Sequence, residues 1–237
     1  MGKQYLVTGA ASGIGKAVTE ALLSQGAKVW RMDRLPEVEL RIDVGEEAEW
    51  VEAVSRFEQV DGIVHAAGIS AGSPIVETPA EEWRRVLRVN LDGSFFALKH
   101  GLPKVVEGGS VVLLGSASGT KASAGAAAYC VSKAGVAMLA RVAALEAKAR
   151  KVRVNVVSPA GVVTDMWKTM AFFRDLVEET GSEMGAFAAL GGAEPEKHPL
   201  ERMAFAGEVA EAVLFLLGDG SRGITGHELR VDAGYTI

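Results

Sequence analysis

Tyr129 and Lys133 are the residues of this chain whose types and spacing most directly suggest chemistry. They lie four residues apart in a segment, 126–149, whose composition is typical of a helix, so both side chains lie on one face, one turn apart. A phenol with a pKa near 10 is a poor base at neutral pH, but a neighbouring ammonium favours the phenolate. Lowering the pKa of Tyr129 by about three units corresponds to roughly 4 kcal/mol, and Lys133 is placed to supply part of it.

Ser116 and Asn90 extend this pair to a candidate catalytic set. The pair alone indicates little, because helices often place Tyr and Lys four residues apart for solvent-facing reasons. Ser116 directly follows the apolar run 110–115, which is typical of a buried strand. A hydroxyl at the carboxyl end of such a strand faces the ligand crevice of an open α/β sheet. With Asn90 upstream, the set contains the groups that move a proton when a hydride passes between an alcohol and a carbonyl.

A glycine-rich turn stands between the first predicted strand and a helix. Residues 8–15 read Thr-Gly-Ala-Ala-Ser-Gly-Ile-Gly. Glycines permit a tight turn, and the helix N-terminus offers free N–H groups and a positive dipole end to a pyrophosphate. The residues expected to bind a dinucleotide here are Gly9, Ser12, Gly13, Ile14 and Gly15. A Walker-type phosphate loop fits less well, because position 10 is Ala and Lys16 is followed by Ala17.

Asp33 ends the second predicted strand, about 20 residues after the glycines. A carboxylate at this place can accept both ribose hydroxyls and would repel a 2′-phosphate, which favours NAD over NADP. Arg31 and Arg34 flank Asp33, and an arginine can pair with that phosphate, so NADP stays as the alternative.

Apolar strand-like runs alternate with amphipathic helical stretches along the chain. The predicted strands are Gln4–Val7, Ala27–Met32, Gly62–Ala66, Val111–Leu114, Val152–Val157 and Glu228–Val231. The predicted helices are Ile14–Gln25, Glu46–Phe57, Pro79–Val106, Ala126–Ala149 and Gly207–Leu217. The alternation indicates an α/β fold with a doubly wound, Rossmann-type parallel sheet and helices on both faces. Only nine residues separate Asp33 from Asp43, so the second strand can pair with the short run 38–42 only through an abbreviated link.

Composition narrows the class of protein further. With 237 residues, 49% hydrophobic and 23% charged, the chain is expected to form one domain, 1–237, with a sizeable core. A net charge of −5 without a Lys/Arg block argues against nucleic acid as a partner. The single cysteine, Cys130, makes no internal disulfide and is expected to be a small buried hydrophobe. A first strand near Lys3 is expected to leave no room for a signal peptide. No apolar run is expected to approach the length of a membrane span, about 20 residues, so a cytoplasmic protein is predicted.

Many motifs in one order make the chain similar to the short-chain dehydrogenase/reductase family over nearly its whole length. The motifs are residues 8–15, Asp43-Val44, the His-Ala-Ala-Gly of 65–68, Asn90, Ser116, Tyr129-x-x-x-Lys133, 155–159, 164–166 and 224–232. The resemblance implies a seven-stranded sheet, a nicotinamide cofactor and commonly a homotetramer.

The resemblance also implies roles for individual residues. Tyr129 would be the general acid/base, and Ser116 would hydrogen-bond the substrate oxygen. Lys133 would bind the nicotinamide ribose and lower the pKa of Tyr129, while Asn90 would position a water between Lys133 and solvent. The remaining implied contacts are adenine with Asp43 and Val44, its ribose with Ala66, Ala67 and Gly68, and the carboxamide with Val162 and Thr164.

Two positions depart from the family pattern. His65 and Ala66 stand where the family often has Asn-Asn, which puts a side-chain contribution to the strand or the cofactor fit in doubt, and His65 is interpreted as structural. Ala160 replaces the glycine that usually follows Pro159, which makes the implied contact of Val162 less secure than that of Thr164. His100, His198 and His227 lack the spacing of metal ligands, so no metal site is expected.

Residues 165–205 form a long insertion before the last helix. The positions Met166, Met170, Phe173 and Val177 follow helical spacing. They fit equally well a lid with an apolar substrate pocket and a helix that packs on the core. Residues 191–195, Gly-Gly-Ala-Glu-Pro, would serve a lid as its hinge. The small and apolar residues of 79–106 and 126–149 likewise leave open whether these helices pack on a second subunit or only on their own sheet.

The residues together predict an NAD-linked oxidoreductase that interconverts a secondary alcohol and a ketone, with an apolar or aromatic substrate. A nucleotide-sensing binding or regulatory module on the same fold is the alternative from another class. A sensor needs only the cofactor half, so the Asn, Ser, Tyr and Lys set argues for the enzyme. A sugar-nucleotide epimerase is a weaker rival, because the chain lacks length for an additional substrate domain.

Overall fold

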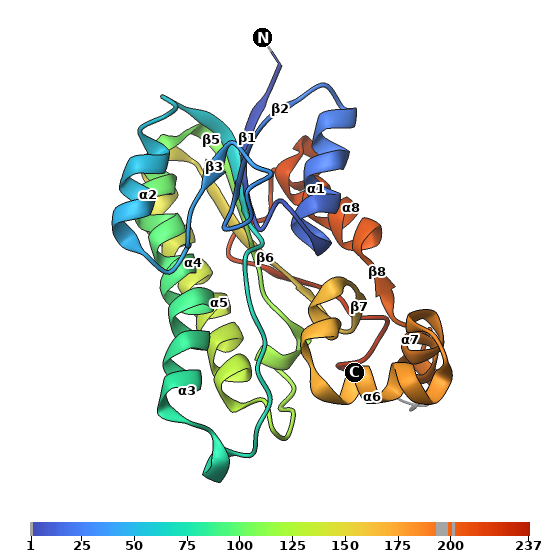
Figure 1. The fold of residues 1–237 in the computed structure, drawn as a ribbon. Coiled ribbons are helices and arrows are strands. Elements are labelled where there is room, and N and C mark those ends of the chain that lie inside the picture. Colours follow the sequence, from blue (N-terminus) through green and yellow to red (C-terminus); the bar gives the residue numbers. More distant parts are fainter. Residues whose placement is uncertain (1, 193–198, 201) are drawn as a thin grey trace.

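Seven parallel strands form the central sheet in the computed structural model, which describes residues 2–192, 199–200 and 202–237 (Figure 1). The strands are β1 Gln4–Thr8, β2 Lys28–Asp33, β3 Leu40–Arg41, β4 Val60–His65, β5 Val105–Leu114, β6 Arg153–Pro159 and β9 Glu228–Val231. Their order is β3-β2-β1-β4-β5-β6-β9, with every neighbouring pair parallel. The direction of winding reverses between β1 and β4, and ligands of such sheets bind at the carboxyl ends beside that point. The predicted Rossmann-type fold is confirmed.

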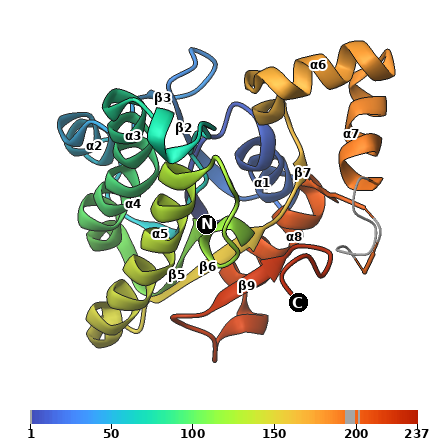
Figure 2. The ribbon, with the colours of Figure 1, turned by 90° about the horizontal axis from the view of Figure 1, so that it is seen from below.

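Helices cover both faces of the sheet (Figure 2). They are α1 Gly13–Ser24, α2 Glu47–Val54, α3 Ala80–Leu87, α4 Gly93–Phe96, α5 Ala127–Glu146, α6 Ala171–Thr180, α7 Glu183–Gly192 and α8 Ala206–Leu217. The helices α2, α4 and α5 lie on one face, with Trp50, Leu98 and Val136 in the core beneath them. The helices α1 and α8 cover the other face, where Val18 and Val213 are buried.

The predicted helix 79–106 is interrupted and ends earlier than expected. Two π-helical turns, η2 Arg88–Asp92 and η3 Ala97–Gly101, separate α3 from α4 and α4 from the short 3₁₀ turn η4 Leu102–Lys104. Strand β5 then begins at Val105, six residues before its predicted start, because Val105 pairs with Val60 of β4. A register shift between Val60 and Gly62 accommodates the glycines at 108 and 109 in this strand.

The short connection after β2 allows β2 and β3 to pair, as predicted. Leu40 and Arg41 pair with Met32 and Asp33 as a two-residue parallel strand, with no helix between. Other predicted bounds shift by up to three residues: α2 ends at Val54 and β6 runs on to Pro159. Short 3₁₀ turns complete the described chain: η1 Ile75–Glu77, η5 Ala117–Gly119, η6 Ala147–Arg150, η7 Asp165–Thr169 and η9 Asp219–Ser221.

The described residues of the insertion 165–205 form a separate small unit beside the carboxyl edge of the sheet (Figure 1). Helices α6 and α7 pack on each other around Phe173 and Phe187, whose ring centroids are 4.8 Å apart. The strands β7 Val162–Val163 and β8 Ala204–Phe205 pair at its base and join it to the domain core.

Helix α5 and the turn after it, Ala127–Arg150, are long and apolar enough to cross a membrane by length and composition alone. The expectation that no run approaches this limit is therefore wrong. The apolarity follows from the position of the helix: Val136, Ala140 and Ala143 are buried against the sheet, and the helix also buries the polar Ser132 and Lys133. Such features are typical of the core helix of a globular protein.

Candidate active site

Ser116, Tyr129 and Lys133 come together at the carboxyl edge of β5. Ser116 follows β5 directly and is 7% exposed, while α5 carries the other two side chains one turn apart. Lys133 is buried, with Nζ 5.8 Å from the centroid of the Tyr129 ring. Its ammonium donates a hydrogen bond of 2.8 Å to the carbonyl oxygen of Leu114, the last residue of β5. A strand end thus fixes the position of the lysine.

The environment sets the acidity of these groups. Burial raises the pKa of the Tyr129 phenol, and a hydrogen bond with Ser116 acts in the opposite direction. Burial also lowers the pKa of Lys133 to about 8, because a desolvated ammonium is less stable than a solvated one. The net pKa of the Tyr129 phenol lies above its ordinary value, because desolvation outweighs the hydrogen bond with Ser116, whereas the sequence predicted a lowering by Lys133.

Three side-chain hydrogen bonds of Asn90 join two segments of the site. Asn90 lies in the π-helical turn η2 and is 1% exposed. Its amide nitrogen donates to the carbonyl of Ile69 and to Ser132 Oγ, and its Oδ1 accepts from the Ile69 N–H. Ser132 Oγ in turn donates to the carbonyl oxygen of Tyr129. Asn90 therefore links the loop after β4 to the first turns of α5, and π-helical turns are frequent at functional sites.

The glycine turn has the shape that a pyrophosphate requires. Gly9 and Gly13 adopt positive φ angles of 66° and 52°. A Cβ at Gly9 would lie 2.9 Å from the backbone nitrogen of Ala67, and one at Gly15 would clash with the carbonyl oxygen of Gly9. Ser12 precedes α1 and its hydroxyl caps no N–H of the helix, so the first-turn N–H groups, Ile14 included, stay available to an anion. The residues present fit a dinucleotide.

Two carboxylates beside this turn are held by hydrogen bonds. Asp33 accepts from the N–H groups of Ala11 and Leu35, both at 3.1 Å, which ties the end of β2 to the glycine turn. Asp43 accepts from the Gly45 N–H and forms a 3.0 Å ion pair with Arg88 of η2. Asp43 raises the pKa of Arg88 accordingly.

The other predicted cofactor residues surround the same edge. Val44 is buried, and its carbonyl accepts from the indole of Trp50. A Cβ at Gly13 would lie 3.5 Å from Cγ2 of Thr164, so Thr164 stands opposite the glycine turn. Val162 is also buried, and its carbonyl accepts from the indole of Trp167 at 2.7 Å.

The turn after β4 completes this edge. The N–H groups of Ala66 and Ala67 both donate to Thr8 Oγ1 at 3.1 Å. A Cβ at Gly68 would lie 3.3 Å from Asn90 Oδ1 and 3.5 Å from Lys133 Nζ. The space beside the lysine thus depends on this glycine.

Sequence reasoning did not single out Ser132, Thr8 as a side chain, or the Leu114 carbonyl. Ser132 had a weak signal, because it lies three residues after Tyr129 and hence on a neighbouring part of the same helix face. The contacts of Thr8 and Leu114 join residues 58 and 19 positions apart, and no local pattern reports them.

Comparisons with known proteins agree with this arrangement. The family described as "Enoyl-(Acyl carrier protein) reductase" matches residues 9–236. D-threitol dehydrogenase of Mycolicibacterium smegmatis is 32% identical, over 100% of this chain and 94% of the relative. The 2,3-dihydro-2,3-dihydroxybenzoate dehydrogenase of Bacillus subtilis is 33% identical, over 100% and 97%. A solved short chain dehydrogenase family protein of Francisella tularensis superposes with a TM-score of 0.89 at 30% identity, over 100% and 99%.

The chain belongs to the short-chain dehydrogenase/reductase family. It is therefore an oxidoreductase that acts on a small molecule, and members of this family use NAD(H) or NADP(H).

The insertion of this short-chain dehydrogenase/reductase has a small apolar cluster of its own among its described residues. Phe173 and Phe187 are buried, and Trp167, Met170 and Val177 pack around them. The helical spacing therefore reports packing of α6 on α7, Val163 of β7 and Met203, and not on the core of the sheet. Met166, Phe172 and Met184 are exposed, with Met166 lying outside this cluster. Of the predicted hinge, Gly191 and Gly192 end α7, and residues 193–195 lie outside the described residues.

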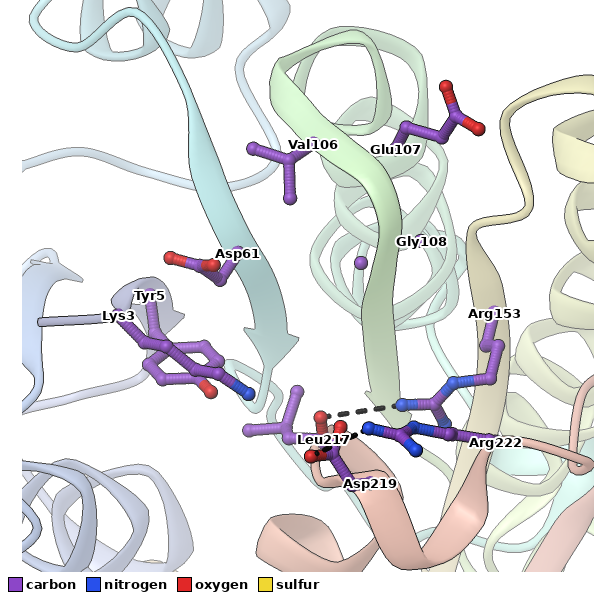
Figure 3. A pocket seen from close by; sticks show the side chains of 11 residues that line it. Lys3, Tyr5, Asp61, Val106, Glu107, Gly108, Arg153, Leu217, Asp219 and Arg222 are labelled. Carbon is purple, nitrogen blue, oxygen red and sulfur yellow. Dashed lines mark hydrogen bonds and ion pairs between the residues drawn. The ribbon is translucent and has the colours of Figure 1, made fainter.

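A cavity of about 170 Å³ lies at the opposite, amino-terminal edge of the sheet (Figure 3). Lys3, Tyr5 and Asp61 line it together with Arg153, whose guanidinium donates to the carbonyls at the end of α8. An arginine at a helix C-terminus satisfies carbonyls that lack intrahelical partners. This cavity therefore reflects how β6 is attached to α8, and none of the four candidate catalytic residues lines it.

Proposed function

We propose that this chain is an NAD-linked oxidoreductase that interconverts a secondary alcohol and a ketone, with Tyr129 as general acid/base. The observation that carries the proposal is the placement of the Tyr129 phenol beside Ser116 and the buried Lys133 ammonium, at the same sheet edge as the glycine turn. A nicotinamide dinucleotide, when bound, supplies the hydride acceptor or donor.

Each residue of the set then has a defined task. Tyr129 holds the proton that leaves the alcohol or is given to the carbonyl oxygen. Ser116, whose Oγ accepts the Ser118 N–H, orients that oxygen through its own hydroxyl proton. Lys133 provides a positive charge beside the phenolate and a donor for the nicotinamide ribose. Asn90 keeps the α5 turn in place and positions a water between Lys133 and solvent.

The preference for NAD over NADP is supported by the environment of Asp33. The guanidinium of Arg31 is held by Glu39 in a bidentate ion pair, with nitrogen–oxygen distances of 2.6 and 2.8 Å. Arg31 is thus already neutralised, whereas the exposed Arg34 guanidinium has no partner in the described part of the chain. The charge of Asp33 is consequently the main barrier to a 2′-phosphate.

Turnover and cofactor choice can be tested together. A panel of secondary alcohols and ketones, assayed with NAD(H) and NADP(H) in parallel, is expected to show turnover chiefly with NAD(H). Asp33→Asn removes the charge at nearly constant size and is expected to change the NAD/NADP affinity ratio about tenfold towards NADP, since one charge near a phosphate is worth about 1–2 kcal/mol.

The control is the double variant Asp33→Asn/Arg34→Ala, in which the gain in NADP affinity is expected to shrink. A wild-type preference for NADP would refute the assignment of Asp33. Tight dinucleotide binding without turnover of any alcohol or ketone would favour a nucleotide-sensing module instead.

We also propose that the substrate is an apolar or aromatic alcohol and that the insertion 165–205 acts as its lid. The exposed Met166, Phe172 and Met184 on this insertion support an apolar substrate. The name of the Bacillus subtilis relative, which describes a cyclic diol, is consistent with an alcohol on a ring.

A homotetramer in the cytoplasm completes the proposal. Val131, Met138, Val142 and Leu145 form an apolar stripe along α5 and are 44–78% exposed. Large exposed apolar patches mark interaction sites, and most oligomers of soluble proteins are symmetric assemblies of identical subunits.

The stripe predicts the effect of charged substitutions on assembly. Met138→Glu/Leu145→Glu is expected to yield a smaller species than the wild-type tetramer, because two charges would be desolvated at the contact. Size-exclusion chromatography with light scattering measures this, with Leu23→Glu, a half-exposed position on α1, as the matched control. Unchanged mass in the double variant, or a monomeric wild type, would disprove the interface.

A further inference from the structure

His65 is a buried titratable residue to which the proposed mechanism gives no role. It ends β4 and is 2% exposed, and its Nδ1 lies 3.0 Å from Thr8 Oγ1 at the end of β1. Thr8, which is fully buried, also receives the N–H groups of Ala66 and Ala67. The hydroxyl group of Thr8 therefore links the end of β1 to the end of β4 and to the start of the turn that leads to Gly68.

Counting protons determines the direction of the Thr8–His65 hydrogen bond. A hydroxyl has two acceptor lone pairs and one proton. The N–H groups of Ala66 and Ala67 occupy both lone pairs of Thr8 Oγ1, so the hydroxyl proton is the only group left for His65. His65 Nδ1 is thus the acceptor, and the ring proton of the neutral imidazole is on Nε2.

The same count shows that His65 must stay neutral. A protonated ring would carry a donor on Nδ1, and Thr8 Oγ1 would then have three donors for two lone pairs. Burial, together with the nearby Lys133 ammonium, lowers the pKa of His65 to about 3. Nε2, which carries the ring proton, is buried and has no hydrogen-bond partner among the described residues. An unsatisfied buried donor is costly, so the ring is retained for what Nδ1 does.

The network bears directly on the dinucleotide site. The peptide between Ala66 and Ala67 packs against Gly9, where a Cβ would lie 2.9 Å from the Ala67 nitrogen. A shift of that peptide would therefore alter both the glycine turn and the loop that leads to Gly68 beside Lys133. The position of the loop depends on Thr8 keeping both lone pairs on these two N–H groups.

We propose that His65 is a positioning residue for the dinucleotide site: its Nδ1 takes the Thr8 proton and thereby fixes Thr8 as the double acceptor for Ala66 and Ala67. The inference rests on the proposed cofactor site. It gives His65, which stands where the family often has Asn, a task that an Asn side chain can also perform, because Asn Oδ1 is an acceptor at the same distance from the backbone as Nδ1.

A merely structural role makes the opposite prediction. The His65 ring lies 6.0 Å from the Trp50 ring, centroid to centroid, and fills core volume. His65→Phe keeps the ring and its volume but removes the acceptor, whereas His65→Asn keeps the acceptor and removes most of the ring. If volume alone mattered, Phe would be tolerated and Asn would be harmful.

The test measures the dissociation constant of NADH by nicotinamide fluorescence for wild type and both variants, with the melting temperature recorded beside it. We expect His65→Phe to weaken NADH binding about tenfold or more and His65→Asn to stay within about threefold of wild type, even where the Asn variant melts lower. Thr8→Val is expected to weaken binding as much as His65→Phe. The double variant Thr8→Val/His65→Phe should be no weaker than Thr8→Val alone, because both changes remove one shared interaction.

Wild-type affinity in His65→Phe, an equal loss in the Asn and Phe variants, or additive losses in the double variant would overturn the inference. If His65→Phe does not fold, the NADH dissociation constants of Thr8→Val and His65→Asn are compared instead. Equal losses of affinity in these two variants would then overturn the inference. A wild type that binds neither NADH nor NADPH would instead refute the proposed function itself, and the inference with it.

Discussion

Replacing Tyr129 with Phe is expected to abolish measurable turnover while dinucleotide affinity stays within about threefold of wild type. The substitution removes one hydroxyl, and general acid/base groups contribute about 10²- to 10⁴-fold to rate. The ring and its position one turn before Lys133 are retained, so the lysine and the glycine turn are left in place. Steady-state rates with a substrate from the alcohol and ketone panel, together with NADH titrations, measure the two effects separately.

Tyr5→Phe is the matched control, because it removes a tyrosine hydroxyl at the opposite edge of the sheet, beside the cavity that Lys3, Asp61 and Arg153 also line. Its turnover is expected to equal that of wild type. Turnover retained in Tyr129→Phe would refute the proposed mechanism.

The pH dependence of the same reaction follows from the environment of Tyr129. Alcohol oxidation needs the phenolate, so its rate is expected to rise with pH as the phenol ionises. Since burial raises the pKa of Tyr129 and the Ser116 hydrogen bond lowers it, Ser116→Ala is expected to move this rise to higher pH.

Replacing Lys133 with Met is expected to reduce turnover by at least about 10²-fold and, at neutral pH, to stabilise the fold. The charged lysine is buried, and its pKa is lowered from 10.5 to about 8, which corresponds to a penalty of the order of 3 kcal/mol. The Met variant also loses the hydrogen bond to the Leu114 carbonyl, which destabilises the fold by about 1 kcal/mol and offsets part of the gain. A net gain of about 2 kcal/mol at pH 7 follows, or a melting temperature a few degrees higher.

The sign of the pH effect distinguishes this cause from better packing. Below pH 8 the lysine is protonated in both the folded and the unfolded state, so the penalty is fully present. Between pH 8 and 10.5 the unfolded chain binds the proton and the folded chain does not, so the stability of the wild type rises with pH. The advantage of the Met variant is therefore expected to shrink over this range.

Thermal unfolding at several pH values measures this effect, with Lys148→Met at an exposed position of η6 as the control that should change neither activity nor the pH slope. A constant difference between the Met variant and wild type from pH 7 to 10 would show that the penalty is not electrostatic.

The two substitutions probe different parts of one arrangement. A protein core normally excludes a charged lysine, and in the proposed mechanism the loss of stability at Lys133 is offset by its contribution to turnover, as is common where active sites keep groups that weaken the fold. The role proposed for His65 is of the same kind: its Nε2 has no partner among the described residues, while its Nδ1 lies 3.0 Å from Thr8 Oγ1.

Local chemistry made several features readable in the sequence alone. Four-residue spacing on a helix places Tyr129 and Lys133 on one face, and a strand that ends at Leu114 places Ser116 at the carboxyl edge. The spacing of Gly9, Gly13 and Gly15 predicts a tight turn, which other residues would not form because of the positive φ angles and the close backbone contacts at these positions. The order of strands and helices then follows from hydrophobic periodicity and from the handedness of the crossovers.

Other features depend on residues that are distant in sequence. Strand β5 begins at Val105 because Val60 is there to pair with it, although the local pattern continues a helix to Val106. The sequence leaves Arg31 as a possible ligand of a 2′-phosphate, whereas in the folded chain its guanidinium forms an ion pair with Glu39 of the following segment. Phe173 and Phe187 form a cluster of their own because α6 folds against α7 beside the sheet.

By itself, the sequence determined the fold class and pointed to the candidate reactive groups and their order along the chain, because side-chain type, periodicity and turn chemistry are local properties. Only the tertiary structure decided the acidity of those groups and which partners hold them. Burial raised the pKa of Tyr129 where an adjacent ammonium suggested the reverse, and it kept His65 neutral. Desolvation and hydrogen bonding depend on every segment packed around a group, and those segments come together only when the chain has folded.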